Sequence, residues 1–343
     1  MQNNIEKLRA ITEILLKPED DYTELPQAIN DLFSMFLSTS HLDVDDSQNR
    51  EHVYLSKGKA IGTTWAAMCV KEFMRTKYFI KGLYAGIKAA QEKFPNTKIH
   101  ILYAGTGPFA TLAIPMTTVF TSEEINFTFL EINPVSIQFL EKTISAFHAE
   151  NYVNAIIQCD ATTYQTDKSK PIHIVLTETM QNALQKEPQV AITMNLVPQM
   201  LPDGILIPQN IKIDATLINP KKNVERLTNP DFGNQKYYHT IKTIFDLNNE
   251  TSALYPIERI LGISSYSFPE VIVKLPSDID PEYKELCLFT NIQVFGDIEL
   301  TNWQCSLNLP KKLMNINQQT ISSDKISFQY VINDKPGFQY KFV

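Results

Sequence analysis

The sequence is poor in cysteine, and the cysteines that it has lie far apart. They are Cys69, Cys159, Cys287 and Cys305, the only four among 343 residues. Such spacing lacks the close pairing of ligands in a zinc site, and the number is too small for a disulfide-stapled scaffold. We therefore expect no metal site, and free thiols of the kind found in the cytoplasm.

Long apolar runs and an excess of basic residues are also missing. Nowhere do 18 apolar residues run together, and the first residues alternate charged with apolar side chains, so the sequence predicts neither a membrane span nor a secretory signal. The formal charge is −7, whereas a nucleic-acid-binding surface needs a basic face. We expect a cytoplasmic protein that binds neither membrane nor nucleic acid.

What the sequence does contain is material for a large core, arranged in three zones. Hydrophobic residues make up 43% of the chain. Residues 1–50 have helical spacing and predict a helical N-terminal extension. Residues 51–208 alternate short apolar runs with helical stretches, which predicts a Rossmann-like α/β domain. Residues 209–343 predict an antiparallel sandwich or β-barrel-like domain. Its strand-like runs include 211–218, 270–275, 291–300, 305–309 and 326–332.

Candidate ligand-binding residues follow three successive apolar runs of the Rossmann-like zone. Gly105 and Gly107 follow the first run, where the absence of side chains lets a ligand approach the backbone. Glu131 ends the second run, placed to accept hydrogen bonds from ribose hydroxyls, and Asp160 ends the third, placed to accept from an adenine amino group. Because the carboxyl ends of parallel strands meet at one edge of a sheet, this order favours a nucleoside-bearing cofactor.

The order of these features resembles class I S-adenosylmethionine-dependent methyltransferases, and the flanking motifs resemble those of the protein arginine methyltransferases. "E-F-M-R-T-K-Y" at 72–78 is similar to the family's Asp-x-x-Arg-Thr segment, and "T-E-T-M-Q-N-A-L-Q-K-E" at 177–187 to its double-glutamate hairpin. "M-L-P-D-G-I-L-I-P" at 200–208 and "T-N-W-Q" at 301–304 resemble its Lys-Pro-Gly-Gly segment and Thr-His-Trp loop. The resemblance implies S-adenosylmethionine as cofactor, with Arg75 clamping its methionine carboxylate.

The two glutamates suit the chemistry that the resemblance implies. A guanidinium has a pKa above about 12, so it needs orientation and charge localisation more than deprotonation. Glu178 and Glu187 would grip its planar fork and leave one nitrogen free to attack, while Trp303 would close the pocket and stack on it. The two glutamates are nine positions apart, about 2.5 turns of a helix. In one straight helix they would face opposite ways, so a shared substrate requires a hairpin.

The sequence departs from the family's pattern at several positions. Tyr103 stands where the first glycine of the loop is expected, and Ile101 replaces an acidic residue. Asn302 replaces the histidine of the Thr-His-Trp loop, so a His–carboxylate pair that assists proton removal is absent. The segment before Arg75 also lacks the relatives' tyrosine-rich helix, which indicates a rebuilt substrate-side wall.

These departures leave the substrate open between several classes. We favour free L-arginine or a close small analogue, as in natural-product biosynthesis. The helical N-terminal extension precedes the rebuilt wall, and an extra cover over the substrate entrance suits a small ligand better than a peptide. Its α-carboxylate would need a cationic partner, and Lys77 and Lys81 are candidates. The alternatives are arginine in a protein or peptide, another small-molecule amine, and a non-catalytic S-adenosylmethionine-binding protein.

Residues 219–260 fall where the related barrels insert a dimerisation arm. The segment includes "N-P-K-K-N-V-E-R-L" and "Y-Y-H-T-I-K-T-I-F-D-L". On this basis we expect a homodimer. The alternative is an arm folded onto its own barrel.

Overall fold

The computed structural model describes residues 2–255, 262–278, 280–316 and 323–343. Its helices are α1 (Gln2–Leu16), α2 (Glu24–Ser40), α3 (Thr63–Met68), α4 (Phe73–Lys93), α5 (Pro134–Ala146), α6 (Gln189–Leu196), α7 (Pro220–Thr228) and α8 (Asn249–Leu254). Its strands are β1 (Val53–Leu55), β2 (Gly58–Ala60), β3 (Ile99–Ala104), β4 (Ile125–Glu131), β5 (Val153–Gln158), β6 (Ile174–Thr177), β7 (Ile205–Ile207), β8 (Asn210–Ile218), β9 (Tyr238–Leu247), β10 (Tyr266–Ser267), β11 (Val271–Lys274), β12 (Glu285–Phe295), β13 (Ile298–Leu300), β14 (Lys311–Asn315), β15 (Lys325–Ile332) and β16 (Gly337–Phe342). None of the described helices is both long and apolar enough to cross a membrane.

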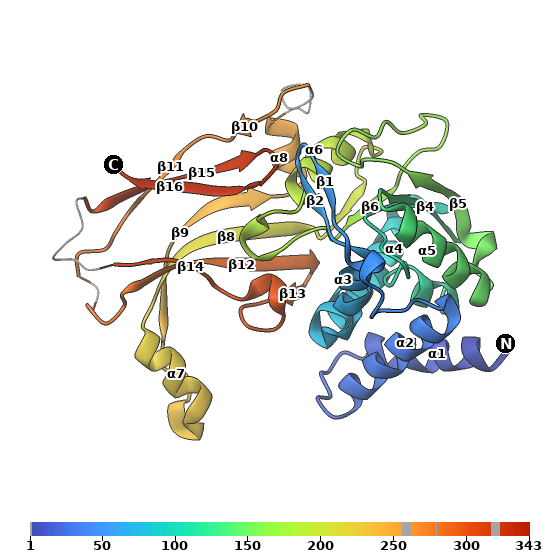
Figure 1. Ribbon diagram of the computed structural model, residues 1–343, viewed down its shortest axis with the longest axis horizontal. Coiled ribbons are helices and arrows are strands. Elements are labelled where there is room, and N and C mark those ends of the chain that lie inside the picture. The colour runs from blue at the N-terminus through green and yellow to red at the C-terminus, as the bar shows by residue number, and fades with distance from the viewer. Residues whose placement is uncertain (1, 256–261, 279, 317–322) are drawn as a thin grey trace.

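Five parallel strands form the sheet on the right of Figure 1, in the order β5-β4-β3-β6-β7. Each of them arises from an apolar run, and β3, β6 and β7 are buried along their whole length. The chain builds outward from β3 to β5 and then returns to add β6 and β7 on the other side. In such sheets the ligand crevice lies beyond the carboxyl ends of the strands where the order reverses, here β3 and β6. The predicted Rossmann-like unit is confirmed.

The helical extension packs onto this unit. Leu8 and Leu15 of α1 and Leu32 and Phe36 of α2 are buried. Phe36 stacks on Phe109 of the parallel unit, with the ring centroids 5.0 Å apart. α1 also contacts α4, and α2 contacts α5. The predicted N-terminal helices are present, and their apolar faces are covered by the body of the protein.

The second half is antiparallel, but it is not a closed barrel in the part of the chain that the structure describes. One sheet has the order β13-β12-β8-β9 with β14 beside β12, and the other has the order β10-β15-β11 with β16 beside β15. Phe245 of β9 joins them through stacking on Tyr330 of β15, with centroids 5.0 Å apart. β9 lies near β11 without pairing to it. Of the two predicted alternatives, the described residues form the sandwich: two antiparallel sheets that face each other across an aromatic core, without barrel closure.

Residues 305–309, predicted as a strand, instead contain a 3-10 turn at Ser306–Asn308. The fully buried Asn308 side chain accepts hydrogen bonds from the backbone N–H groups of Gln304 and Cys305, at 3.1 and 2.9 Å. A side chain that satisfies nearby backbone donors offers the chain an alternative to a sheet ladder. The loop therefore curls around Asn308 instead of extending.

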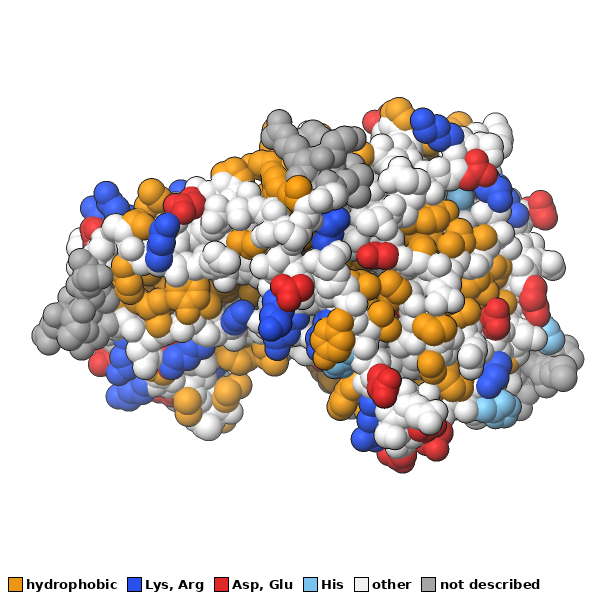
Figure 2. Space-filling model, turned by 45° about the horizontal axis from the view of Figure 1, so that its top comes forward, with side chains coloured by type: hydrophobic (Ala, Val, Ile, Leu, Met, Phe, Trp, Pro, Cys, Tyr) orange, Lys and Arg blue, Asp and Glu red, His pale blue; other side chains and the backbone are white. Residues whose placement is uncertain are grey.

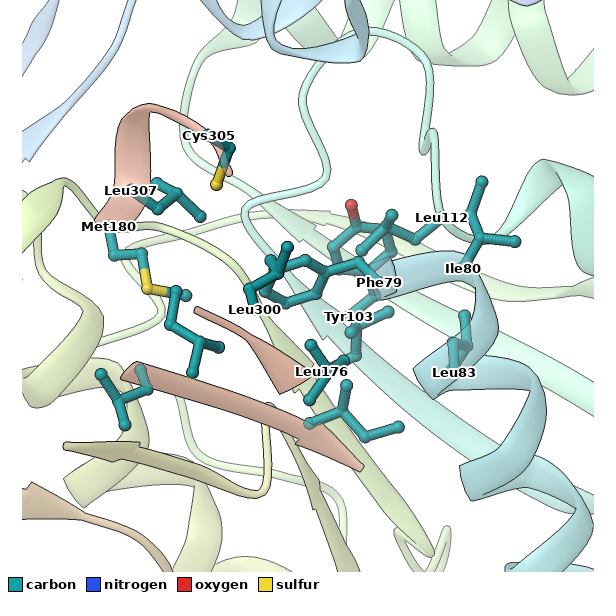
Figure 3. Close-up of a cluster of buried hydrophobic side chains, with 14 of the residues drawn as sticks. Phe79, Ile80, Leu83, Tyr103, Leu112, Leu176, Met180, Leu300, Cys305 and Leu307 are labelled. Carbon is teal, nitrogen blue, oxygen red and sulfur yellow. The ribbon is translucent and has the colours of Figure 1, made fainter. Parts of the chain in front are cut away.

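The two halves share one hydrophobic core. A Cβ on Gly82 of α4 would lie 2.2 Å from Val294 Cγ1 of β12, so only glycine allows this close approach. Figure 3 shows the adjoining cluster, in which Phe79 of α4 lies near Leu300 of β13 and the side chains of Met180 and Leu307. On the outer face drawn in Figure 2, acidic and basic side chains are interspersed with hydrophobic ones. The core therefore holds the antiparallel sheets against the edge of the parallel unit where the candidate site lies.

Candidate active site

A large cavity lies beyond the carboxyl ends of β3, β4, β5 and β6. Its empty space is about 1020 Å³, a figure that includes open solvent at its mouth. The hairpin β1–β2 and α3 also contribute to its wall through Leu55, Lys59 and Ala66. All five sequence-derived cofactor residues and both glutamates line it, namely Arg75, Gly105, Gly107, Glu131, Asp160, Glu178 and Glu187. The structure thus brings together residues that are more than a hundred positions apart.

The glycine loop follows β3 and turns sharply. Gly105 and Gly107 have φ angles of 74° and 61°, a left-handed region that glycine adopts without a Cβ penalty. A Cβ on Gly105 would also lie 2.2 Å from Thr179 Cγ2. The loop therefore runs directly beneath the segment that carries Glu178, and a side chain at Gly105 would separate the two.

Glu131 is held at the end of β4 by backbone N–H groups. Its Oε2 accepts from Gly107 at 2.8 Å, and its Oε1 accepts from Ile132 and Asn133, both at 2.9 Å. Burial raises the pKa of this carboxyl, and the three hydrogen bonds act against that rise. Each carboxylate oxygen has two lone pairs, so Oε2 keeps capacity for a ligand hydroxyl.

Asp160 is half-buried just beyond β5. Its Oδ1 accepts a hydrogen bond from Thr162 N at 2.8 Å, which orients the carboxylate in the cavity wall. Cys159 lies beside it in the cavity wall, and burial raises the pKa of the Cys159 thiol to about 11. This part of the wall therefore presents one oriented acceptor beside a neutral thiol.

Arg75 forms the centre of an ion cluster at the start of α4. Its Nη1 lies 2.9 Å from Glu72 Oε2, and its Nη2 lies 2.5 Å from Glu178 Oε1. The contact with Glu178 has the distance of an ion pair but not the alignment of a hydrogen bond, and Arg75 Nε is buried without a partner among the described residues. Glu72 also accepts from the Ser306 N–H and hydroxyl at 3.0 and 2.9 Å. Arg75 thus holds one candidate catalytic glutamate and keeps one donor free.

The segment between the two glutamates is a loop and not a helix. β6 ends at Thr177 and α6 begins at Gln189. Between them Ala183, Leu184 and Lys186 have positive φ angles of 55°, 52° and 67°. The chain therefore reverses its direction, as a shared substrate requires, and both carboxylates reach the same cavity.

The second half of the protein anchors this loop. Thr290 Oγ1 of β12 accepts from Ala183 N at 2.8 Å, and the Tyr330 hydroxyl of β15 donates to Leu184 O at 2.7 Å. On the other side, Lys59 N of the β1–β2 hairpin donates to Lys186 O at 2.9 Å. Such fixed placement limits the entropy lost when a ligand is gripped.

Burial governs the ionisation of both glutamates. It raises the pKa of Glu178 to about 7, while Arg75 acts to lower it and the charge of Glu187 acts to raise it. Burial also raises the pKa of Glu187, against a hydrogen bond from Gln181 and the charges of Arg75 and Lys59. Two negative charges so close together are unfavourable, so the pair of carboxyls favours a bound cation over carrying both charges alone.

Trp303 was predicted to close the pocket and stack on the guanidinium. It is not among the residues that line the cavity. Its ring instead stacks on the guanidinium of Arg226 from α7, with the guanidinium carbon 4.6 Å from the ring centroid. Asn302 Oδ1 is buried without a partner among the described residues. The role predicted for Trp303 would require the 301–308 loop to move.

The assignment of Lys77 and Lys81 to the substrate's carboxylate is wrong, because neither lines the cavity. The buried Lys77 Nζ pairs with Asp20 Oδ1 at 2.7 Å, and Lys81 Nζ donates to Pro18 O at 3.2 Å. Both therefore tie α4 to the α1–α2 connection. Lys59, which no sequence motif singled out, lines the cavity and makes no ion pair among the described residues. Its signal was the "L-S-K-G-K" turn, in which glycine marks a hairpin.

Comparisons with known proteins find matches among solved structures. No protein-family model and no curated protein matches the sequence. Among solved structures, the PRMT1 enzyme–prozyme heterotetramer of Trypanosoma brucei, determined with AdoHcy, is 13% identical with a TM-score of 0.48, covering 76% of this chain and 85% of that one. Arabidopsis thaliana protein arginine methyltransferase 10, described as having a uniquely open conformation, is 11% identical with a TM-score of 0.48, covering 75% and 84%.

Proposed function

We propose that this protein is an S-adenosylmethionine-dependent N-methyltransferase that acts on a guanidino group. The observation that carries the proposal is the meeting of Arg75, Glu131, Asp160 and both loop glutamates around one cavity. The sequence motifs by themselves predict which residues belong to the site. Their convergence from α4, β4, β5 and the β6–α6 loop supplies the geometry that a bisubstrate reaction needs.

The cavity fits the cofactor at three places. Glu131 is the acceptor for the ribose hydroxyls, and Asp160 is the acceptor for the adenine amino group. The unpartnered Arg75 Nε is the donor for the methionine carboxylate. When bound, the cofactor supplies an electrophilic methyl group on its sulfonium. Gly105 lets the glycine loop pack against Thr179 at this edge of the cavity, because a Cβ would lie 2.2 Å from Thr179 Cγ2.

The two glutamates prepare the guanidinium. Glu178 and Glu187 accept hydrogen bonds from two of its nitrogens, which fixes the plane and draws positive charge to their side. The remaining nitrogen would keep electron density and would be free to take the methyl group that the bound cofactor supplies. The extra proton then leaves that nitrogen for a glutamate or water. A pKa of about 7 suits Glu178 to accept it.

Free L-arginine or a close small analogue is the substrate that we favour. The hairpin β1–β2 lies against the glutamate loop: a Cβ on Gly58 would be 3.0 Å from Lys186 O. A covered cavity suits a small ligand better than an extended peptide. Lys59 is the cation in the cavity wall that no carboxylate neutralises among the described residues. We assign it to the substrate's α-carboxylate.

Arginine and its decarboxylated analogue agmatine test this assignment. We expect methylation of arginine with a lower KM than agmatine, and Lys59→Met should raise the KM for arginine roughly 10- to 150-fold, because a charge-assisted hydrogen bond contributes about 1.5–3 kcal/mol. The KM for agmatine should hardly change. Lys186→Met is the matched control, since Lys186 is exposed on the glutamate loop. Turnover of arginine-rich peptides with none on arginine would overturn the substrate and keep the chemistry.

Calorimetry tests the cofactor separately from turnover. We expect the protein to bind S-adenosylmethionine and its demethylated product, and Glu131→Ala to weaken both roughly 10- to 150-fold. Glu141→Gln on α5 is an exposed acidic control. No binding by the folded wild-type protein would end the proposal. Binding without transfer to any guanidine would instead favour a non-catalytic cofactor-binding protein.

A further inference from the structure

The arm between β8 and β9 places an arginine against the Trp303 loop. The guanidinium carbon of Arg226, on α7, lies 4.5 Å from the ring centroid of Tyr237 and 4.6 Å from that of Trp303. Arg226 Nε donates to Asn223 Oδ1 at 2.9 Å, which orients the planar group. An oriented guanidinium against two aromatic rings is a strong cation–π arrangement.

Stacking carries this contact, because hydrogen bonds do not. Arg226 Nη2, Trp303 Nε1 and Asn302 Oδ1 are all buried without a hydrogen-bond partner among the described residues. Trp303 has a φ of 74°, which is sparsely populated by residues with a side chain. A residue in this conformation needs its surroundings to hold it, and Arg226 covers the ring of Trp303.

The same loop reaches the candidate catalytic glutamate. Trp303 N donates to Asn308 O at 3.3 Å, and Asn308 holds the turn at residues 304–305. Ser306, the next residue, donates to Glu72. Glu72 pairs with Arg75, and Arg75 pairs with Glu178. A continuous series of contacts therefore joins the arm to the site.

We propose that Arg226 is a positioning residue: its stacking on Trp303 fixes the 301–308 loop and, through Ser306 and Glu72, the placement of Arg75 and Glu178. Its effect on turnover rests on the proposed function, whereas its effect on the loop does not. Arg226 itself stays outside the cavity and touches neither substrate nor cofactor. The arm is thereby a structural support of the site as well as a projecting surface.

Lys222 provides a matched control on the same helix. Its Nζ lies 5.7 Å from the ring centroid of Tyr283, another cation–π contact of α7, but Tyr283 has no contact with the 301–308 loop among those described. Lys222→Ala should therefore leave the loop in place. Arg226→Lys keeps a cation and should rescue part of what Arg226→Ala loses.

Two readouts follow the loop without any turnover. The chain has two tryptophans, so a Trp65→Phe background makes Trp303 the only fluorophore of its kind. Arg226→Ala should at least double acrylamide quenching of Trp303, and it should speed labelling of the buried Cys305 thiol at least fivefold. Lys222→Ala should change neither, and Arg226→Lys should lie between. Unchanged quenching and labelling in Arg226→Ala would overturn the proposal, whether or not the wild type is active.

Kinetics then test the link to the site. With a guanidino substrate that the wild type methylates, Arg226→Ala should lower kcat about tenfold and weaken cofactor binding, because both Glu178 and Arg75 lose their support. A loosened loop with unchanged kcat would also overturn the positioning role. If the wild type methylates no guanidine, the proposed function fails. Labelling of the Cys69 thiol then tests whether the loop acts on the Arg75 cluster, because Cys69 lies close enough to Arg75 and Glu178 for their charges to act on its thiol. We expect faster Cys69 labelling in Arg226→Ala. Unchanged Cys69 labelling would then overturn it.

Discussion

At the scale of single residues, the site depends on a carboxylate that is costly to ionise. The Glu178 side chain is 13% exposed and lies beside Arg75, and the ion pair only partly offsets the loss of hydration. Glu131 solves the same problem with three backbone donors. The two carboxylates therefore suit different tasks. Glu131 is a fixed acceptor, and Glu178 exchanges its proton near neutral pH.

The first prediction concerns the pH dependence of turnover. Because the folded pKa of Glu178 is raised to about 7, the carboxylate that grips a guanidinium forms only as pH rises through that value. We expect kcat/KM to rise with pH through about 7, since this ratio reports ionisation in the free enzyme.

The same shift has a sign for stability. Between the unfolded value and about pH 7 the folded chain binds the proton more tightly than the unfolded chain does, so this group's contribution to the free energy of unfolding declines as pH rises through that window.

For the kinetic prediction, a kcat/KM profile that is flat from pH 5.5 to 8.5 would contradict the role of Glu178.

At the scale of elements, the glycine loop and the glutamate loop must touch. A second prediction is that Gly105→Ala costs about 1–3 kcal/mol in the free energy of unfolding from backbone strain alone, with further loss from the collision with Thr179. Gly107→Ala is the matched comparison, because its φ is also positive but its Cβ would lie 3.3 Å from Ala66. Denaturant unfolding should show the larger loss for Gly105→Ala, with cofactor binding abolished. Equal losses would show that the contact with Thr179 is unimportant.

Sequence patterns predicted the elements that obey a simple period. The five parallel strands follow apolar runs because both of their faces are buried. Residues 305–309 instead alternate apolar with polar side chains, as a half-buried strand would, yet the Asn308 side chain replaces strand pairing with local hydrogen bonds. Barrel closure was also beyond reach, because it depends on pairing between distant edges that no local pattern encodes.

The site was predictable where motif and strand end coincide. Arg75, the glycines and the acidic residues all line the cavity. Lys77 and Lys81 failed because their true partners, at the α1–α2 connection, are about 60 positions away in the sequence. Lys59 escaped notice for the same reason: a hairpin brings it to the glutamate loop. Long-range contacts decide which of several lysines faces a ligand.

At the scale of the whole molecule, α7 projects from the antiparallel half in Figure 1. Val224 and Leu227 on it are 60% and 68% exposed, more than apolar residues usually are. Residues 256–260 of the predicted arm segment lie outside the described part. We propose that the arm contributes to a homodimer and predict a dimeric mass by light scattering at micromolar concentration. Val224→Asp with Leu227→Asp should yield monomers, and a monomeric wild type would contradict the proposal.

The central claim is that the cavity transfers a methyl group to a guanidine gripped by two glutamates. Its most direct test is mass spectrometry of free arginine after incubation with methyl-deuterated S-adenosylmethionine. The wild type should add a labelled methyl group to a guanidino nitrogen, and Glu178→Gln and Glu187→Gln should each lose at least a hundredfold in rate while still binding cofactor. A protein that binds cofactor but leaves arginine, its small analogues and arginine-rich peptides all unlabelled would contradict the account.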